Sequence, residues 1–340
     1  LADPDRMPKE IPDLDLYHPW EIGADDASEI ARSCEDAARS ADARIRNSEG
    51  ATLYTQRSGF VYGNTHGFIG GYPTSRHSLS CAVIAEDGSD MQRDYWYDSG
   101  RLADRLAEPA TIGRRAAERT LARLNGRKLS TRECPVLYRA DVAPSLLRSL
   151  FSALRGHAVY RRSTFLLDSV GATIFPAWVN ITEDPLKPQG AASAPFDNEG
   201  VQTAFRELVS DGVLQGYLLD SYSARKLGQQ STASAGGVRN ARIDNSGQDF
   251  AGLLKEMGTG LLVTELMGHG TNLVTGDYSR GAAGFWVEGG EIQFPVEEIT
   301  VAGNLRDMFR GLVAVGTDND IPGSIDTGSW LIEKMTVAGD

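Results

Sequence analysis

Residues 261–302, LLVTELMGHGTNLVTGDYSRGAAGFWVEGGEIQFPVEEITVA, decide the class of fold. Short apolar segments alternate there with glycine-containing breaks, which is the pattern of strands joined by tight connections. Beyond Pro185 the chain has the same Gly-rich character, and Asp211-Gly212 predicts a hairpin joining Phe205–Val209 to Val213–Leu219. The second half of the chain is therefore predicted to be rich in β-strands.

A second β region is predicted between residues 50 and 100. Short segments there are separated by Ser58-Gly59, His66-Gly67 and Asp87-Gly88, and dipeptides of this kind favour turns. The pattern predicts an antiparallel meander whose segments are Ala51–Arg57, Phe60–Gly63, Ser78–Ala85 and Arg93–Tyr97.

Amphipathic helices are predicted beside both β regions. One follows Asp25-Asp26, whose carboxylates favour a helix N-terminus, and a second ends near Gly126. A third is predicted between Asp141 and His157, with Asp141 as its cap and an apolar stripe on one face.

Two further helices are predicted near the C-terminal end. Ser246 with Asp249 resembles a capping box, and Asn304 is a second candidate cap. Helices and strands are mixed without a strict βαβ rhythm. The sequence therefore predicts an α+β fold with helices packed on large, mainly antiparallel β-sheets, for which barrel-like closure is one option.

The 340 residues suffice for one large domain or two ordinary ones. A soft boundary is placed near residue 130, so that residues 1–130 hold a linker, helix, meander and helix, and residues 131–340 form a β-rich C-terminal domain. Residues 1–22 are rich in Pro and Asp and have the character of an extended linker. Because the chain begins with Leu1, we expect it to be part of something longer.

The charge disfavours direct binding to nucleic acid. The chain has 34 basic and 46 acidic residues, for a net charge of −12, and no basic stripe that would attract a polyanion. No apolar run reaches the roughly 18 residues needed to span a bilayer, so no membrane association is expected. The three cysteines, an odd number without a C-x-x-C pair, fit a reducing compartment and predict a cytoplasmic location.

The densest polar cluster lies at residues 268–281. His269, Asp277 and Ser279 are the residue types of a hydrolytic triad, but no G-x-S-x-G elbow presents this serine. The cluster is instead interpreted as contacting a peptide or a partner, with a structural β connection in which Asp277 and Arg280 pair as the equal alternative. The candidate contact residues are His269, Thr275, Asp277, Tyr278, Ser279 and Arg280.

Several motifs in order resemble the TldD/PmbA family of metallopeptidases. They are TELMGHG at 264–270, TGDYSRGAAGFWVE at 275–288 and EITVAGNL at 298–305, supported by STFLLD at 163–168 and PFDNEG at 195–200. The resemblance spans nearly all of the chain. It implies that an N-terminal α/β segment of the family is missing from this sequence.

The resemblance also implies a heteromeric protease whose TldD subunit carries zinc on an H-E-x-x-x-H helix. In this sequence the two His positions fall at Arg148 and Ala153, and the Glu position falls at Ser149. A further cysteine ligand of that subunit falls near Thr327. Since none of these side chains can replace its counterpart, we expect no metal in this chain and zinc in a TldD-like partner.

The function implied by the resemblance is that of the subunit without a metal site in a cytoplasmic TldD-containing protease. It would aid proteolysis of unfolded peptides and the maturation of leader-bearing peptides. Two other classes stay open: a self-sufficient hydrolase with an unrecognised site such as His269–Asp277–Ser279, and a regulatory binding protein acting on the DNA gyrase system. A homodimer in isolation is also left open.

Overall fold

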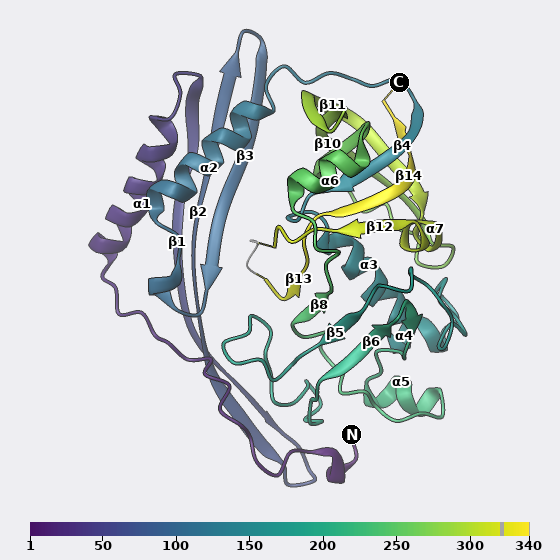
Figure 1. Ribbon diagram of the computed structural model, residues 1–340. Coiled ribbons are helices and arrows are strands. Elements are labelled where there is room, and N and C mark those ends of the chain that lie inside the picture. The colour runs from purple at the N-terminus through teal and green to yellow at the C-terminus, as the bar shows by residue number, and fades with distance from the viewer. Residues whose placement is uncertain (320–322, 340) are drawn as a thin grey trace. The chain divides into compact units, whose positions relative to one another are not determined.

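The computed structural model describes residues 1–319 and 323–339, and the chain divides into two compact units (Figure 1). Unit 1 comprises Leu1–Leu14, Val61–Gly70 and the described residues from Lys128 onward. Unit 2 comprises Asp15–Phe60 and Gly71–Arg127. None of the helices in the described residues combines the length and apolar character needed to cross a bilayer.

Unit 2 is built on a three-stranded sheet of order β1-β2-β3, in which β2 and β3 pair antiparallel. Helix α1 packs against α2, and α2 packs against β3. The bounds are α1 (Ala24–Arg39), β1 (Ile45–Gly63), β2 (Ile69–Asp87), β3 (Asp90–Gly100), the 3-10 turn η2 (Ala103–Arg105) and α2 (Pro109–Ala122).

The predicted meander is present, but the lengths predicted for its strands are wrong. The turns at His66-Gly67 and Asp87-Gly88 are present between the strands. Ser58-Gly59, however, lies inside β1, which continues without a break. The reason is that pairing with β2 satisfies the backbone groups of this segment, and such pairing outweighs a local turn preference.

Five strands of unit 1 close into a barrel (Figure 1). The order is β11-β10-β9-β4-β14, and antiparallel pairing of β11 with β14 completes the ring. Only the β4–β9 pair in this ring is parallel, so the prediction of mainly antiparallel, barrel-like sheets is confirmed. The bounds are β4 (Arg132–Tyr138), β9 (Gly260–Met267), β10 (Asp277–Glu288), β11 (Glu291–Asn304), β14 (Trp330–Ala338) and the added strand β12 (Leu312–Val315).

A second sheet of unit 1 has the order β13-β8-β5-β6-β7. Its predicted hairpin at Asp211-Gly212 is confirmed, because β6 and β7 pair antiparallel across these two residues. Both residues have positive φ, as the commonest two-residue hairpin turn requires. The bounds are β5 (Ile181–Glu183), β6 (Arg206–Ser210), β7 (Val213–Leu214), β8 (Ala241–Ile243) and β13 (Ile325–Asp326).

The helices of unit 1 are short, and their caps differ partly from the prediction. Asn304 caps α7 through a bond from the Arg306 N–H, as expected. In α6 the cap is Asp249, and Ser246 instead donates to the carbonyl of Val315. The bounds are η1 (Pro4–Arg6), α3 (Pro144–Leu154), α4 (Gly156–Tyr160), α5 (Ser221–Lys226), α6 (Phe250–Met257) and α7 (Leu305–Arg310).

The helix predicted from Asp141 to His157 is in fact two helices. Asp141 is not its cap, because its carboxylate accepts two hydrogen bonds of 2.7 Å from Arg139 and α3 begins at Pro144. The chain becomes extended at Arg155. At the break, Gly156 donates to the carbonyl of Leu218, and a Cβ on Gly156 would lie 2.1 Å from the Ser223 Oγ. This close approach ends α3 and starts α4.

The core of unit 1 lies where α3 packs its apolar stripe into the barrel region. The stripe residues are buried as predicted: Leu146, Leu147, Leu150, Phe151 and Leu154. They share one cluster with residues of the barrel strands, Tyr138, Val263 and Tyr278 among them. The opposite face of α3 is consequently left to its polar residues.

Candidate functional site

A pocket of about 450 Å³ in unit 1 joins the polar face of α3 to the loop that follows β9. It contains four residues singled out from the sequence, namely Arg148, Ser149, His269 and Arg280. Its walls also include Ser145, Ser152, Gly268, Gly270, Thr271 and Leu273. Two of the positions that the family resemblance aligns with zinc ligands therefore form one site with part of the polar cluster at 268–281, and we call this site the α3 pocket.

The polar face of α3 is shaped by hydrogen bonds within the helix. The Ser149 hydroxyl donates to the carbonyl of Ser145 at 3.1 Å, and the Ser152 hydroxyl donates to that of Arg148 at 2.8 Å. Such bonds one turn back keep the hydroxyls close to the helix surface. The Arg148 side chain is exposed, so it is free to reach into the pocket.

The opposite wall is a loop fixed to β10 by its backbone. The Ser279 N–H donates to the Gly270 carbonyl at 2.7 Å, and the Asn272 N–H donates to the Asp277 carbonyl at 2.8 Å. A Cβ on Gly270 would lie only 1.4 Å from the carbonyl oxygen of Ser279. Glycine is therefore required at 270 for the loop to come this close to the strand.

The α3 pocket is cationic. Two arginines and one histidine line it, and none of its lining residues in the described part of the chain is acidic. Within residues 1–319 and 323–339, no carboxylate lies in ion-pair distance of Arg148 or Arg280. In addition, Ser145 Oγ and Arg280 Nε are buried and have no hydrogen-bond partner among residues 1–319 and 323–339.

The residues at the zinc positions do not fit zinc. Ala153 is fully buried and has no ligand atom, and Arg148 cannot give up its proton. The Thr327 hydroxyl is buried and accepts a 2.7 Å hydrogen bond from the indole of Trp330. Over the described part of the chain, no group of three or more His, Cys, Asp or Glu side chains could hold a metal ion.

The remaining candidates of the polar cluster serve other contacts. Asp277 accepts hydrogen bonds from the hydroxyl of Thr275 at 2.6 Å and from the amide of Asn304 at 3.2 Å. Tyr278 is 2% exposed and belongs to the core, and burial raises the pKa of its hydroxyl. Direct peptide contact by Tyr278 is thus sterically closed, whereas Ser279 is exposed.

The contacts of Asp277 affect two interpretations of the cluster at 268–281: a structural pair with Arg280 and a hydrolytic triad. Asp277 and Arg280 stand three residues apart on β10, so their side chains point to opposite faces of the strand. They therefore do not form the pair that the structural interpretation required. The Asp277 carboxylate is engaged by Thr275 and Asn304 and is not the orienting group of a triad. Of the six candidate contact residues, His269 and Arg280 line the α3 pocket.

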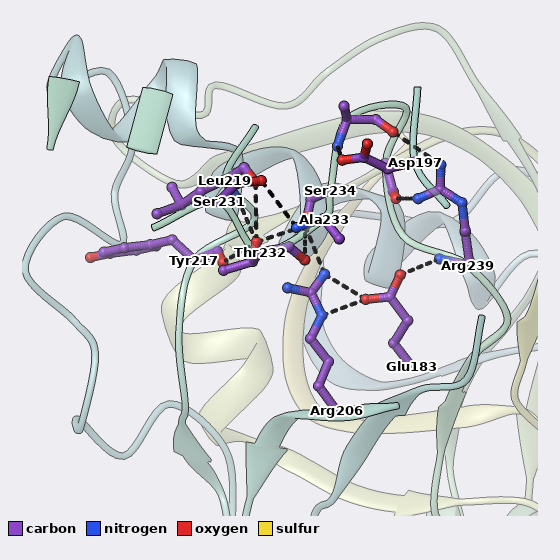
Figure 2. A network of polar contacts seen from close by, with 12 residues as sticks. Glu183, Asp197, Arg206, Tyr217, Leu219, Ser231, Thr232, Ala233, Ser234 and Arg239 are labelled. Carbon is purple, nitrogen blue, oxygen red and sulfur yellow. Dashed lines mark hydrogen bonds and ion pairs between the residues drawn. The ribbon is translucent and has the colours of Figure 1, made fainter. Parts of the chain in front are cut away.

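A buried polar network that no sequence pattern predicted lies beside the second sheet of unit 1 (Figure 2). The Glu183 carboxylate, 2% exposed, accepts from the Arg206 guanidinium at 2.6 Å and from the Arg239 N–H at 2.7 Å. Arg206 also donates to Ser234 at 2.8 Å. The motif PFDNEG at 195–200, which supported the family resemblance, contains Asp197; this carboxyl is fully buried, which raises its pKa, and accepts a hydrogen bond from the Ala235 N–H.

The network fixes the loop that lines a smaller pocket of about 310 Å³. Arg239 donates to the carbonyls of Ala235 and Gly237 and so holds the glycine turn from inside. The pocket mixes charges, since its walls carry Arg155, His157 and Asp220. This smaller pocket therefore discriminates less between anionic and cationic ligands than the α3 pocket does.

Two cysteines that are far apart in the sequence meet in unit 2. Cys34 of α1 and Cys81 of β2 are both free and buried. The hydrogen bond with Cys81, together with burial, raises the pKa of the Cys34 thiol. The same hydrogen bond lowers the pKa of the Cys81 thiol, but both thiols are buried, so the pair packs between the helix and the sheet.

The chain is similar to known proteins over its whole length. The sequence patterns of the PmbA/TldA metallopeptidase central domain and C-terminal domain match residues 17–124 and 131–339, respectively. Metalloprotease PmbA of Escherichia coli is 52% identical over 339 residues, which cover 100% of this chain and 75% of that protein. A metalloprotease PmbA homolog of Haemophilus influenzae is 48% identical and is covered to 76%.

Solved structures share the fold. The crystal structure of a candidate modulator of DNA gyrase from Bacteroides thetaiotaomicron superimposes with a TM-score of 0.94 at 30% identity, over 100% of this chain and 78% of that one. TldE from Thermococcus kodakarensis gives a TM-score of 0.83 at 21% identity, over 98% and 79%. The second likeness concerns the fold alone.

Proposed function

Because the chain belongs to the TldD/PmbA family of metallopeptidases, we propose that it is the subunit without a metal site of a protease completed by a TldD-like partner. The partner would hold the zinc and activate water. This chain would support the partner's active site and hold unfolded or leader-bearing peptides in an extended form, for example by strand addition. We place this activity in the cytoplasm.

The observation that carries the proposal is the state of the helix at the zinc positions. Arg148 and Ser149 face the α3 pocket, where a ligand can reach them. Ala153 faces the core and is closed to any ligand. A zinc site needs at least three protein ligands in fixed geometry. The helix is nevertheless well packed, which is the expected result when a family member keeps the scaffold and changes the chemistry of the site.

The isolated chain is expected to bind no stoichiometric zinc and to cleave no peptide. Metal analysis after dialysis and an assay with an unstructured peptide measure these two properties. Mixing with the cognate TldD-like subunit should give a complex on a sizing column, with peptidase activity that a chelator abolishes. One zinc per isolated chain, or chelator-resistant cleavage by the chain alone, would refute the proposal.

Restoring the three motif positions is expected not to restore activity. In the variant Arg148→His, Ser149→Glu, Ala153→His, the third change places an imidazole in a fully buried position and costs about 1–3 kcal/mol through overpacking. Thr327 would still offer no thiolate, and groups that orient the ligands would be missing. Zinc-dependent cleavage by this triple variant alone, in a metal and peptidase assay, would contradict the prediction.

A further inference from the structure

The α3 pocket has the chemistry of an anion site rather than that of an empty metal site. Arg148 comes from the helix, Arg280 from β10 and His269 from the connecting loop, so three separate segments bring donors to one cavity. In a chain with a net charge of −12, a pocket with this lining is a local exception. The net negative charge of the chain repels free anions, whereas the positive side chains of this pocket attract them.

The pocket also holds donors whose bonding is incomplete. Ser145 Oγ and Arg280 Nε are buried and find no hydrogen-bond partner in the part of the chain that the structure describes, while Ser149 and Ser152 already donate within the helix. Buried groups in this condition point to a ligand that supplies acceptors. An oxyanion supplies only acceptors and is therefore the complementary class.

The shape of the loop favours an anion attached to a peptide. Gly268 has open space where a Cβ would stand, and Leu273 adds an apolar contact to the wall. A backbone can therefore pass close to the loop while its charged end lies near the arginines. Arginine matches the planar carboxylate with two parallel hydrogen bonds, which a lysine cannot provide.

We propose that the α3 pocket binds the free C-terminal carboxylate of a peptide through Arg148 and Arg280. The inference rests on the proposed function for the identity of the ligand as a peptide, and not for the binding itself. The pocket thus orients an extended substrate by its end. Arg148 and Arg280 are positioning residues in this role, and neither takes part in bond cleavage.

Binding of fluorescent hexapeptides to the full isolated chain tests the proposal by anisotropy. One peptide has a free C-terminus, a second is amidated, and a third is amidated but contains an internal glutamate; the first two have no acidic side chain. The free acid is expected to bind at least about tenfold more tightly than either amidated peptide, as charge-assisted bonds are the strong ones. Equal binding of free and amidated peptides, or equal binding of the glutamate peptide, would overturn it.

Substitutions of the two arginines test whether the α3 pocket is the binding site. Arg148→Ala is expected to weaken binding of the free acid about tenfold without lowering the melting temperature, because its side chain is exposed. Arg280→Lys keeps the charge and loses the forked geometry, so its binding should also fall. Arg155→Ala, at the other pocket, is the matched control and should bind like the parent chain. Unchanged binding of the free acid by Arg148→Ala and Arg280→Lys would show that the α3 pocket is not the carboxylate site.

The assay separates this inference from the proposed function. It uses neither zinc nor the TldD-like subunit, so preference for the free acid can be read even if no complex forms. Conversely, if the complex with the TldD-like subunit cleaved free and amidated peptides equally well, the proposed function would stand. Recognition of the C-terminal carboxylate by the α3 pocket would then be refuted.

Discussion

Glu183→Ala is expected to lower the free energy of unfolding of unit 1 by about 3–5 kcal/mol, the usual cost of leaving one charge of a buried pair alone. The carboxylate is 2% exposed and lies between Arg206 and the Arg239 backbone, as Figure 2 shows. Its removal leaves the guanidinium of Arg206 with Ser234 as its remaining partner. The loop that carries Ser234 should loosen in consequence.

Unfolding in guanidinium chloride, followed by tryptophan fluorescence, measures this effect. Glu133→Ala is the matched control, because Glu133 pairs with Lys334 at 2.6 Å but both side chains are more than half exposed. An exposed pair contributes only about 0–1 kcal/mol. If the two variants lost the same stability, the buried network would not have the role given to it here.

Gly270→Ala is expected to destabilise unit 1 by about 1–3 kcal/mol or more and to abolish peptide binding at the α3 pocket. The added Cβ would lie 1.4 Å from the Ser279 carbonyl oxygen, so the loop must move away from β10. That movement breaks the 2.7 Å hydrogen bond from the Ser279 N–H and displaces His269. Stability and binding should therefore fall together.

Gly289→Ala provides the control, in the turn between β10 and β11 and outside the lining of the α3 pocket. Nothing among the described residues lies within 4 Å of its added Cβ, and its φ of +60° makes alanine unfavourable by only about 1–2 kcal/mol. We expect it to retain peptide binding in the anisotropy assay. A Gly270→Ala chain that binds the free acid as tightly as the parent would show that the loop wall does not form the site.

Local chemistry in the sequence was enough for several features. The turn at Asp211-Gly212 and the cap at Asn304 depend on residues next to one another, and both are present. The buried stripe of α3 follows from helical spacing alone. Where a neighbouring contact competes, the local signal fails: Asp141 binds Arg139 instead of capping, and Ser58-Gly59 stays in a strand.

The polar cluster at 268–281 shows the limit of a linear pattern. Its residues looked equivalent in the sequence, yet strand alternation sends Tyr278 into the core and Asp277 to the other face. Only knowledge of which face is covered separates them. The covering elements come from elsewhere in the chain, so no local rule could assign them.

The sequence by itself determined the β-rich α+β class and the negative charge of the chain, because each depends on residue identity and short spacing. The family resemblance added the expectation that Arg148, Ser149 and Ala153 stand at zinc-ligand positions. The tertiary structure alone decided the closure of β11 on β14, the contact of Cys34 with Cys81, and the pocket that joins α3 to the loop after β9. An apolar period tells a segment which face to bury but not which partner will cover it. Partners distant along the chain are selected by packing of the whole fold, and the α3 pocket exists only once that packing is complete.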